Sequence, residues 1–103
     1  MKKLLMASAA TLALTGAASA EDVKLGVLIG FTGPIESLTS HMAAAAEMAM
    51  AEVNASGLSA HNFISVRGDS TCVDSAAATS AAERMITADG VKGIIGADCS
   101  GVT

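Results

Sequence analysis

The sequence predicts an α/β protein with a three-layer, doubly wound parallel sheet, of which it supplies only the first β-α-β-α-β portion. Three observations lead to this fold class. Segments with strand-like and helical hydrophobic periods alternate along the chain, and the connections between them are short. The composition, 51% hydrophobic and 16% charged, is that of a globular chain and not of a disordered tail. The length of 103 residues allows one small domain.

Three segments have the pattern of buried strands. The first, over residues 23–29, begins with alternation and becomes continuously apolar, as a strand buried on both faces does. The second is expected over residues 63–67, with side chains alternating between two faces, and the third over residues 91–97. Because a helical segment separates each pair, we expect a parallel sheet with right-handed crossovers.

The first helix is expected from about His41 to Ala55, after a break at the glycines and proline that follow the first strand. Thr39 or Ser40 would cap its start with a side-chain oxygen. Gly57 occupies the position at which a left-handed residue ends a helix. The stripe expected to face the core consists of Met42, Ala46, Ala49 and Val53.

A second helix is expected to run from a cap at Asp74 or Ser75 to about Ala88, with Gly90 ending it. Its buried side is expected to consist of Ala78, Ala81, Ala82 and Met85. A parallel sheet must be covered on both faces, and two Ala-rich helices give little cover. Since the sequence stops at Thr103, directly after the third strand, we expect the N-terminal fragment of a longer protein.

The first twenty residues have the features of a secretory signal peptide. Two lysines form a positive start, residues 4–14 are apolar or small, and a small-x-small triplet ends at Ala20. The apolar run is shorter than the ~20 residues that span a bilayer core of ~30 Å. We expect cleavage between Ala20 and Glu21, which leaves residues 21–103 as the exported part.

Charge and cysteine content narrow the classes of partner. A formal charge of −4 argues against nucleic-acid binding, which needs clustered positive charge to neutralise phosphates. In an exported chain the two cysteines favour a structural disulfide between Cys72 and Cys99 over a redox or zinc site, because they form no CxxC motif and neither histidine has zinc-ligand spacing. Such a bridge contributes roughly 3 kcal/mol on the loop-entropy model. We expect no metal and no cofactor.

The carboxyl ends of the strands are the expected place for a ligand, because open parallel sheets bind ligands where the strand order reverses. The three segments at those ends, residues 30–39, 69–74 and 98–103, are rich in hydroxyls, glycine and acids. A bridge between Cys72 and Cys99 would tie the second segment to the third.

No catalytic arrangement is recognisable in the sequence. Glu47 and Glu52 are five positions apart, which places them ~140° apart around a helix, so they do not converge. Neither a Ser-His-Asp set nor a nucleophile elbow nor a phosphate loop is present. We therefore expect a protein that is not an enzyme. An exported enzyme built on a flavodoxin-like half-domain is the weaker alternative.

Four motifs follow one another along the exported part. They are KLGV leading into TGP (24–27 and 32–34), AEMAMAEVNASG (46–57), GDSTC (68–72) and GADCSGVT (96–103). Together they resemble the opening of a type I periplasmic solute-binding protein. The closest group is the branched-chain amino acid (Leu/Ile/Val) binding proteins of ABC importers, and the resemblance covers nearly all of residues 21–103.

This resemblance implies a two-lobed clamshell, of which residues 21–103 hold the first part of lobe one. It implies a periplasmic protein that binds an amino acid or a related small carboxylate and delivers it to a membrane ABC permease. It also implies a monomer at full length. The family's cystine links the loops after the second and third strands, which matches Cys72 and Cys99.

The resemblance implies ligand contacts at Ser100, at the adjacent Cys99 and at Leu38. Ser100 would hold the α-carboxylate of the ligand, helped by loop N–H groups, or would simply cap a following helix; the two roles are compatible. Leu38 would pack on the ligand side chain or serve as a hydrophobic staple for the helix starting near Ser40. The absence of Trp and Tyr departs from the aromatic-lined pockets usual in such proteins.

Two further functions are compatible with the same sequence. The fold also serves as the ligand-sensing extracellular domain of receptors and regulators, which would share every motif quoted. A complete small interaction protein with an open sheet edge is the other.

Overall fold

The computed structural model describes residues 19–103, so the predicted signal peptide lies outside the described residues except for its last two positions. Strand β1 (Glu21–Ile29) begins at the residue that would follow cleavage. The other elements are α1 (Glu36–Ser56), β2 (His61–Asp69), α2 (Ser75–Thr87), β3 (Gly93–Gly96) and a short 3-10 turn, η1 (Ser100–Val102). Within the described residues, no helix is long and apolar enough to cross a membrane.

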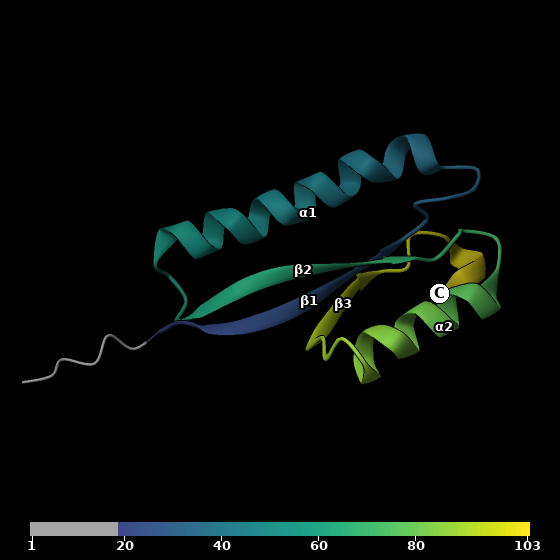
Figure 1. The fold of residues 1–103 in the computed structure, drawn as a ribbon. Coiled ribbons are helices and arrows are strands. Elements are labelled where there is room, and N and C mark those ends of the chain that lie inside the picture. The colour runs from purple at the N-terminus through teal and green to yellow at the C-terminus, as the bar shows by residue number, and fades with distance from the viewer. Residues whose placement is uncertain (1–18) are drawn as a thin grey trace, which may run out of the picture.

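The strands form one parallel sheet in the order β2-β1-β3, with α1 over one face and α2 over the other (Figure 1). This arrangement confirms the predicted α/β class and its alternation of elements. β1 pairs with β2 along its whole length but with β3 only over Leu25 to Leu28. β3 is shorter than predicted, since the N–H of Val91 donates to Met85 O at the end of α2, 3.0 Å away.

The two faces of β1 enter two separate hydrophobic clusters, because successive side chains of a strand point to opposite sides. On the α1 side, Val27 and Ile29 form a buried cluster with Ala43 and Met50. On the α2 side the cluster consists of Leu28, Met85 and Val91. Phe63 packs against the first cluster and Val66 against the second, which confirms the predicted alternation of β2.

Met85 of α2 is fully buried because two glycines of the sheet leave room for it. A Cβ atom at Gly26 would lie 2.6 Å from the Met85 methyl group, and one at Gly68 would lie 2.6 Å from its sulfur. The side chain therefore fills space above β1 and β2 that any larger residue at these two positions would occupy.

Helix α1 begins at Glu36, earlier than the predicted His41. Ile35 occupies its N-cap position without a side-chain cap hydrogen bond, so the prediction of a cap at Thr39 or Ser40 is wrong. Thr39 lies inside the helix, fully buried, and its hydroxyl donates to Glu36 O at 3.1 Å. A threonine that satisfies its hydroxyl within the preceding turn has no need of a cap position. The acidic Glu36 favours the helix start through the helix dipole.

The buried stripe of α1 also differs from the prediction. Met42 and Val53 are 45% and 37% exposed, and the buried residues are Thr39, Ala43 and Met50, with Ala46 partly buried. Because alanines and methionines surround the helix on most sides, hydrophobic spacing alone does not define its inner face. The predicted end is confirmed: Gly57 has a left-handed φ of 70°.

Helix α2 follows the prediction closely. The carboxylate of Asp74 accepts hydrogen bonds from the N–H groups of Ala76 and Ala77, both at 3.0 Å, so Asp74 is the cap. The helix ends at Thr87, and Gly90 follows with a left-handed φ of 71°. Its inner side consists of the predicted residues, with Ala78 and Met85 buried and Ala81 and Ala82 partly buried.

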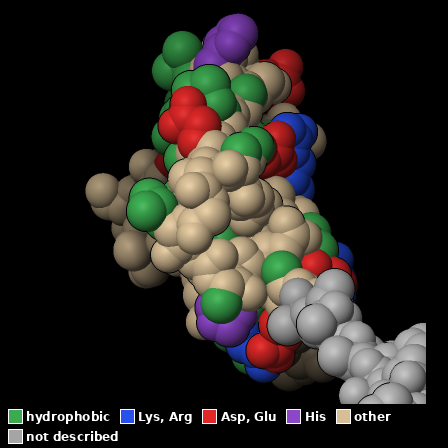
Figure 2. Space-filling model, turned by 90° about the vertical axis from the view of Figure 1, so that its left-hand side faces the viewer, with side chains coloured by type: hydrophobic (Ala, Val, Ile, Leu, Met, Phe, Trp, Pro, Cys, Tyr) green, Lys and Arg blue, Asp and Glu red, His purple; other side chains and the backbone are tan. Residues whose placement is uncertain are grey.

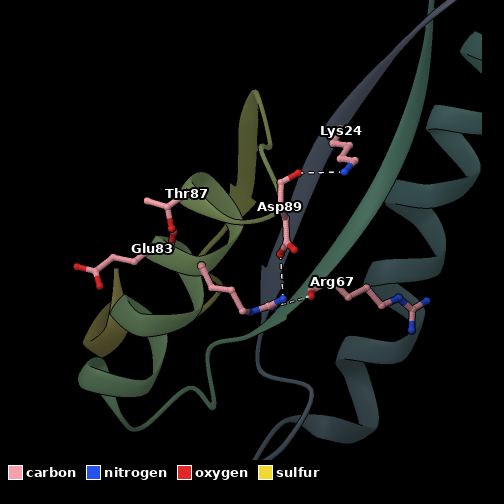
Figure 3. Close-up of polar contacts among 6 residues, drawn as sticks. Lys24, Arg67, Glu83, Thr87 and Asp89 are labelled. Atoms are coloured by element: carbon pink, nitrogen blue, oxygen red, sulfur yellow. Dashed lines mark hydrogen bonds and ion pairs between the residues drawn. The ribbon is translucent and has the colours of Figure 1, made fainter.

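A network of polar contacts lies at the end of the sheet where β3 begins (Figure 3). The guanidinium of Arg84 contacts the Asp89 carboxylate at 2.9 Å, and Lys24 Nζ donates to the Asp89 carbonyl oxygen at 3.1 Å. These contacts tie the end of α2 to β1. They lie away from the carboxyl ends of the strands, where a ligand is expected.

Candidate ligand-binding site

Three loops meet at the carboxyl ends of the strands (Figure 1). We call residues 30–35 the first loop, residues 70–74 the second and residues 97–99 the third; they follow β1, β2 and β3. Since β1 lies between its two partners, the strand order reverses there, and the first and third loops leave the sheet next to each other. This is the switch point of an open parallel sheet.

A disulfide joins the second loop to the third. The sulfur atoms of Cys72 and Cys99 are 2.02 Å apart, and their Cα atoms are 5.2 Å apart, which confirms the predicted bridge. Both cysteines are half-buried. Cys72 and its neighbour Thr71 have left-handed φ angles of 70° and 58°, which non-glycine residues seldom adopt.

The first loop packs directly on the second. A Cβ atom at Gly30 would lie 3.3 Å from Cys72 Cβ. Gly33 has a φ of 98°, and a Cβ atom there would lie 2.5 Å from Thr71 O. Position 33 therefore needs glycine, both for this close approach and for its backbone conformation, whereas a side chain at position 30 would require Cys72 to shift by a few tenths of an ångström. The glycines of the TGP motif region are therefore explained by contact between loops.

Asp69, the last residue of β2, binds both the first and the second loop. Its carboxylate accepts from the hydroxyl and the N–H of Thr32, at 2.6 and 3.3 Å, and from the N–H of Thr71 at 2.8 Å. Burial acts to raise the pKa of Asp69, but the hydrogen bonds from Thr32, Thr71 and Phe31 outweigh it, and the pKa is lowered. These hydrogen bonds favour the ionised form of the Asp69 side chain.

Asp98 of the third loop, like Asp69, accepts hydrogen bonds from two other parts of the chain. Its two oxygens accept from the N–H of Gly30 at 3.2 and 3.1 Å, and its Oδ1 also accepts from the Ser70 hydroxyl at 3.0 Å. In the sequence, Asp69 and Asp98 lie in segments rich in hydroxyls, glycine or acids, and no pattern assigns either residue a role. The signal available was an acid at the end of a predicted strand, and the partners lie 28 to 68 positions away in sequence.

The three predicted ligand residues lie at or near these loops. Cys99 is in the bridge, and Ser100, the first residue of η1, is exposed. Cys99, not Ser100, occupies the N-cap position of η1. Leu38 lies in the first turn of α1 and is 60% exposed. Because α1 has already begun at Glu36, the alternative of Leu38 as a staple preceding the helix is wrong.

Glu47 and Arg67 form an ion pair on the α1 side of the sheet. Arg67 Nε and Nη2 contact the two carboxylate oxygens of Glu47 at 2.7 and 2.8 Å, and the hydrogen bond to Arg67 lowers the pKa of Glu47. The guanidinium also lies 5.2 Å from the centre of the Phe31 ring. Glu47 therefore joins α1 to β2, and Glu52 has no part in the pair.

The chemistry that the loops offer is hydrogen bonding by neutral groups. Hydroxyls and N–H groups are abundant at the strand ends, and neither lysine nor arginine occurs in the three segments there, residues 30–39, 69–74 and 98–103. The carboxylates of Asp69 and Asp98 already accept hydrogen bonds from the protein itself. Within residues 19–103, no group of three or more His, Cys, Asp or Glu side chains could hold a metal ion.

An apolar groove of about 350 Å³ lies elsewhere, between α1 and the sheet. Leu25, Met50, Phe63 and Ile95 are among its lining residues. Ile95 is 48% exposed, so the α1-side face of β3 is incompletely covered. On the side of the molecule in Figure 2, apolar side chains form small separate groups among acidic and basic ones.

Comparison with known proteins gives a consistent result. The family model described as periplasmic binding protein matches residues 22–103. The Leu/Ile/Val-binding protein homolog 7 of Brucella melitensis is 39% identical over an alignment 103 residues long, which covers 98% of this chain and 25% of that protein. The Leu/Ile/Val-binding protein of Escherichia coli K12 is 33% identical, and the Leu/Ile/Val/Thr-binding protein of Salmonella typhimurium is 32% identical; each match covers 98% of this chain and 27% of the relative. The chain thus spans about a quarter of the length of these curated relatives.

Proposed function

Because the chain belongs to the periplasmic binding protein family, we propose that it is the N-terminal part of a longer protein that captures a small solute for an ABC importer. Residues 1–20 would direct export and be removed between Ala20 and Glu21, and residues 21–103 would open the first of two lobes. The family match over residues 22–103 carries this proposal. The protein would work without catalysis, as a monomer in the periplasm.

The ligand proposed is an aliphatic amino acid of the branched-chain type, or a related small carboxylate. The relatives' names support the amino acid, and the composition of the loops supports the manner of binding. Since the loops contain hydroxyls and N–H groups but neither lysine nor arginine, they suit a zwitterion whose carboxylate is bound by neutral donors. The second lobe would supply the other wall, and closure about a hinge would follow from the extra contacts of the bound state.

Ser100 is the residue proposed to hold the ligand carboxylate, with Cys99 beside it and Leu38 packing on the ligand side chain. Ser100 is exposed next to the bridge, and Leu38 presents an exposed apolar side chain at the start of α1. Neither side chain belongs to the hydrophobic core, so both are accessible to a ligand.

The test is calorimetric titration of the longer, oxidised protein with L-leucine, L-isoleucine and L-valine, with Ser100→Ala and Leu38→Ala as variants. A hydrogen bond to a charged group contributes about 1.5–3 kcal/mol, so Ser100→Ala should weaken binding by roughly tenfold or more. Leu38→Ala should weaken binding of leucine more than that of valine. Ser40→Ala and Met48→Ala, at exposed positions of α1, are the matched controls. Unchanged affinity in Ser100→Ala would contradict its role.

A further inference from the structure

The three loops of the candidate site share one carboxylate. Asp98 follows β3 and directly precedes the bridged Cys99. It accepts from the N–H of Gly30, which belongs to the first loop, and from the hydroxyl of Ser70, which belongs to the second. Both donors are buried, and Ser70 is 0% exposed. All three loops therefore meet at Asp98.

A carboxylate is the side chain that suits this position. Buried N–H and O–H groups require acceptors, and leaving one unpaired is costly. An ionised aspartate has two oxygens and no donor, so it can accept from two loops at once. An asparagine has one oxygen, and its amide NH₂ would face a donor. An apolar residue would leave both Gly30 and Ser70 without this partner.

We infer that Asp98 is a positioning residue of the ligand site: it fixes the first and second loops against the third, and so sets the place of Ser100. The inference rests on the proposed function. Asp98 acts through its neighbours, because the oxygens that could meet a ligand accept hydrogen bonds from the protein. The bridge between Cys72 and Cys99 joins only the second and third loops, whereas Asp98 also binds the first loop through the N–H of Gly30.

The experiment compares Asp98→Asn with Asp89→Asn in the longer, oxidised protein. Both variants remove one carboxylate charge, but Asp89 pairs with Arg84 at the far end of the sheet (Figure 3). Two quantities are measured: the dissociation constant for L-leucine, and the amide proton resonance of Gly30. The Gly30 resonance reports the hydrogen bond to Asp98 directly, and a loss of general stability does not shift it.

Asp98→Asn should move the Gly30 amide resonance upfield and weaken leucine binding by about tenfold or more, since it leaves a buried donor unpaired. Asp89→Asn should change neither quantity. Ser70→Ala, which removes a single hydroxyl, is the second variant in case Asp98→Asn fails to fold. It should weaken binding by a smaller factor and leave Gly30 bonded to Asp98.

Two results would overturn the inference. One is a Gly30 resonance that stays in place in Asp98→Asn; the other is leucine affinity within twofold of the wild type in both Asp98→Asn and Ser70→Ala. These outcomes differ from failure of the proposed function, which the wild-type titration reveals by itself. A folded, oxidised wild-type protein that binds no aliphatic amino acid would overturn both.

Discussion

Among single residues, Asp69 is expected to link the stability of the fold to pH. Burial acts to raise the pKa of its carboxyl group, but the hydrogen bonds from Thr32 and Thr71, with a contribution from the Phe31 N–H, outweigh it and lower the pKa. A pKa lower in the folded protein than in the unfolded chain means that the carboxylate stabilises the fold at neutral pH. This stabilisation is complete above the ordinary value of about 3.9 and is lost as the pH falls through the lowered value.

Asp69→Asn should reduce stability at pH 7 by about 1–2 kcal/mol, because the amide leaves donors of Thr32 or Thr71 unpaired. It should also lose less stability than the wild type between pH 5 and pH 2, since the titrating group is gone. Urea unfolding at several pH values measures both effects. The control is Glu52→Gln, which removes an exposed carboxylate of α1. Equal acid sensitivity in Asp69→Asn and the wild type would contradict this account.

At the scale of elements, α2 and α1 differ in how far local sequence determines them. Asp74 caps α2 with two short-range hydrogen bonds, and apolar residues at helical spacing, Ala78, Ala81, Ala82 and Met85, form its inner side. Both features were predictable because they depend on neighbours in sequence. In α1 the inner face and the start depend on packing against β1, and the many alanines leave the choice of side open until the sheet is present. For this reason, the predicted cap at Thr39 or Ser40 was wrong.

The cap of α2 leads to a direct prediction. Asp74→Ala should lower the free energy of unfolding by about 1 kcal/mol, because the N–H groups of Ala76 and Ala77 lose their acceptor. Asp74→Ser, which keeps a capping oxygen, should lie within a few tenths of a kcal/mol of the wild type. Chemical denaturation of the two variants measures the difference. Equal losses would show that the cap contributes nothing.

The contact of α2 with the sheet depends on Met85. Truncating this fully buried side chain to alanine should cost about 2–5 kcal/mol, because a cavity remains above Gly26 and Gly68. Met48→Ala is the matched control, since Met48 is 60% exposed on α1, and its cost should stay within about 0.5 kcal/mol. Thermal unfolding separates the two. A cost for Met85→Ala as small as that for Met48→Ala would contradict the packing described.

At the scale of the whole molecule, the ligand edge depends on contacts between distant parts of the chain. The order of elements along the chain, the parallel pairing and the bridge could be predicted from periodicity, short connections and the cysteine count. The hydrogen bonds of Asp98 could not, because they join residues up to 68 positions apart and no local pattern marks an acceptor of this kind. The contact between Gly33 and Thr71 could not be predicted either, because these residues are also far apart in the sequence.

Replacing both Cys72 and Cys99 by serine should lower the stability of this lobe by roughly 3 kcal/mol, the loop-entropy value for a bridge of this span. It should also weaken ligand binding, since the second and third loops would be joined only through Ser70 and Asp98. Unfolding with and without reductant measures the first effect, and the double variant itself should show no response to reductant. A wild type equally indifferent to reductant would contradict the role of the bridge.

We propose that this chain forms part of a site for a small zwitterionic solute. Isothermal titration of the longer, folded and oxidised wild-type protein with L-leucine tests it most directly, with 3-methylbutylamine, which lacks the carboxylate, as the comparison ligand. We predict saturable binding of one leucine per protein molecule and no measurable binding of the amine. Failure of leucine, isoleucine and valine to bind would show that there is no such site, and equal affinity for the amine would show that the site does not recognise the carboxylate.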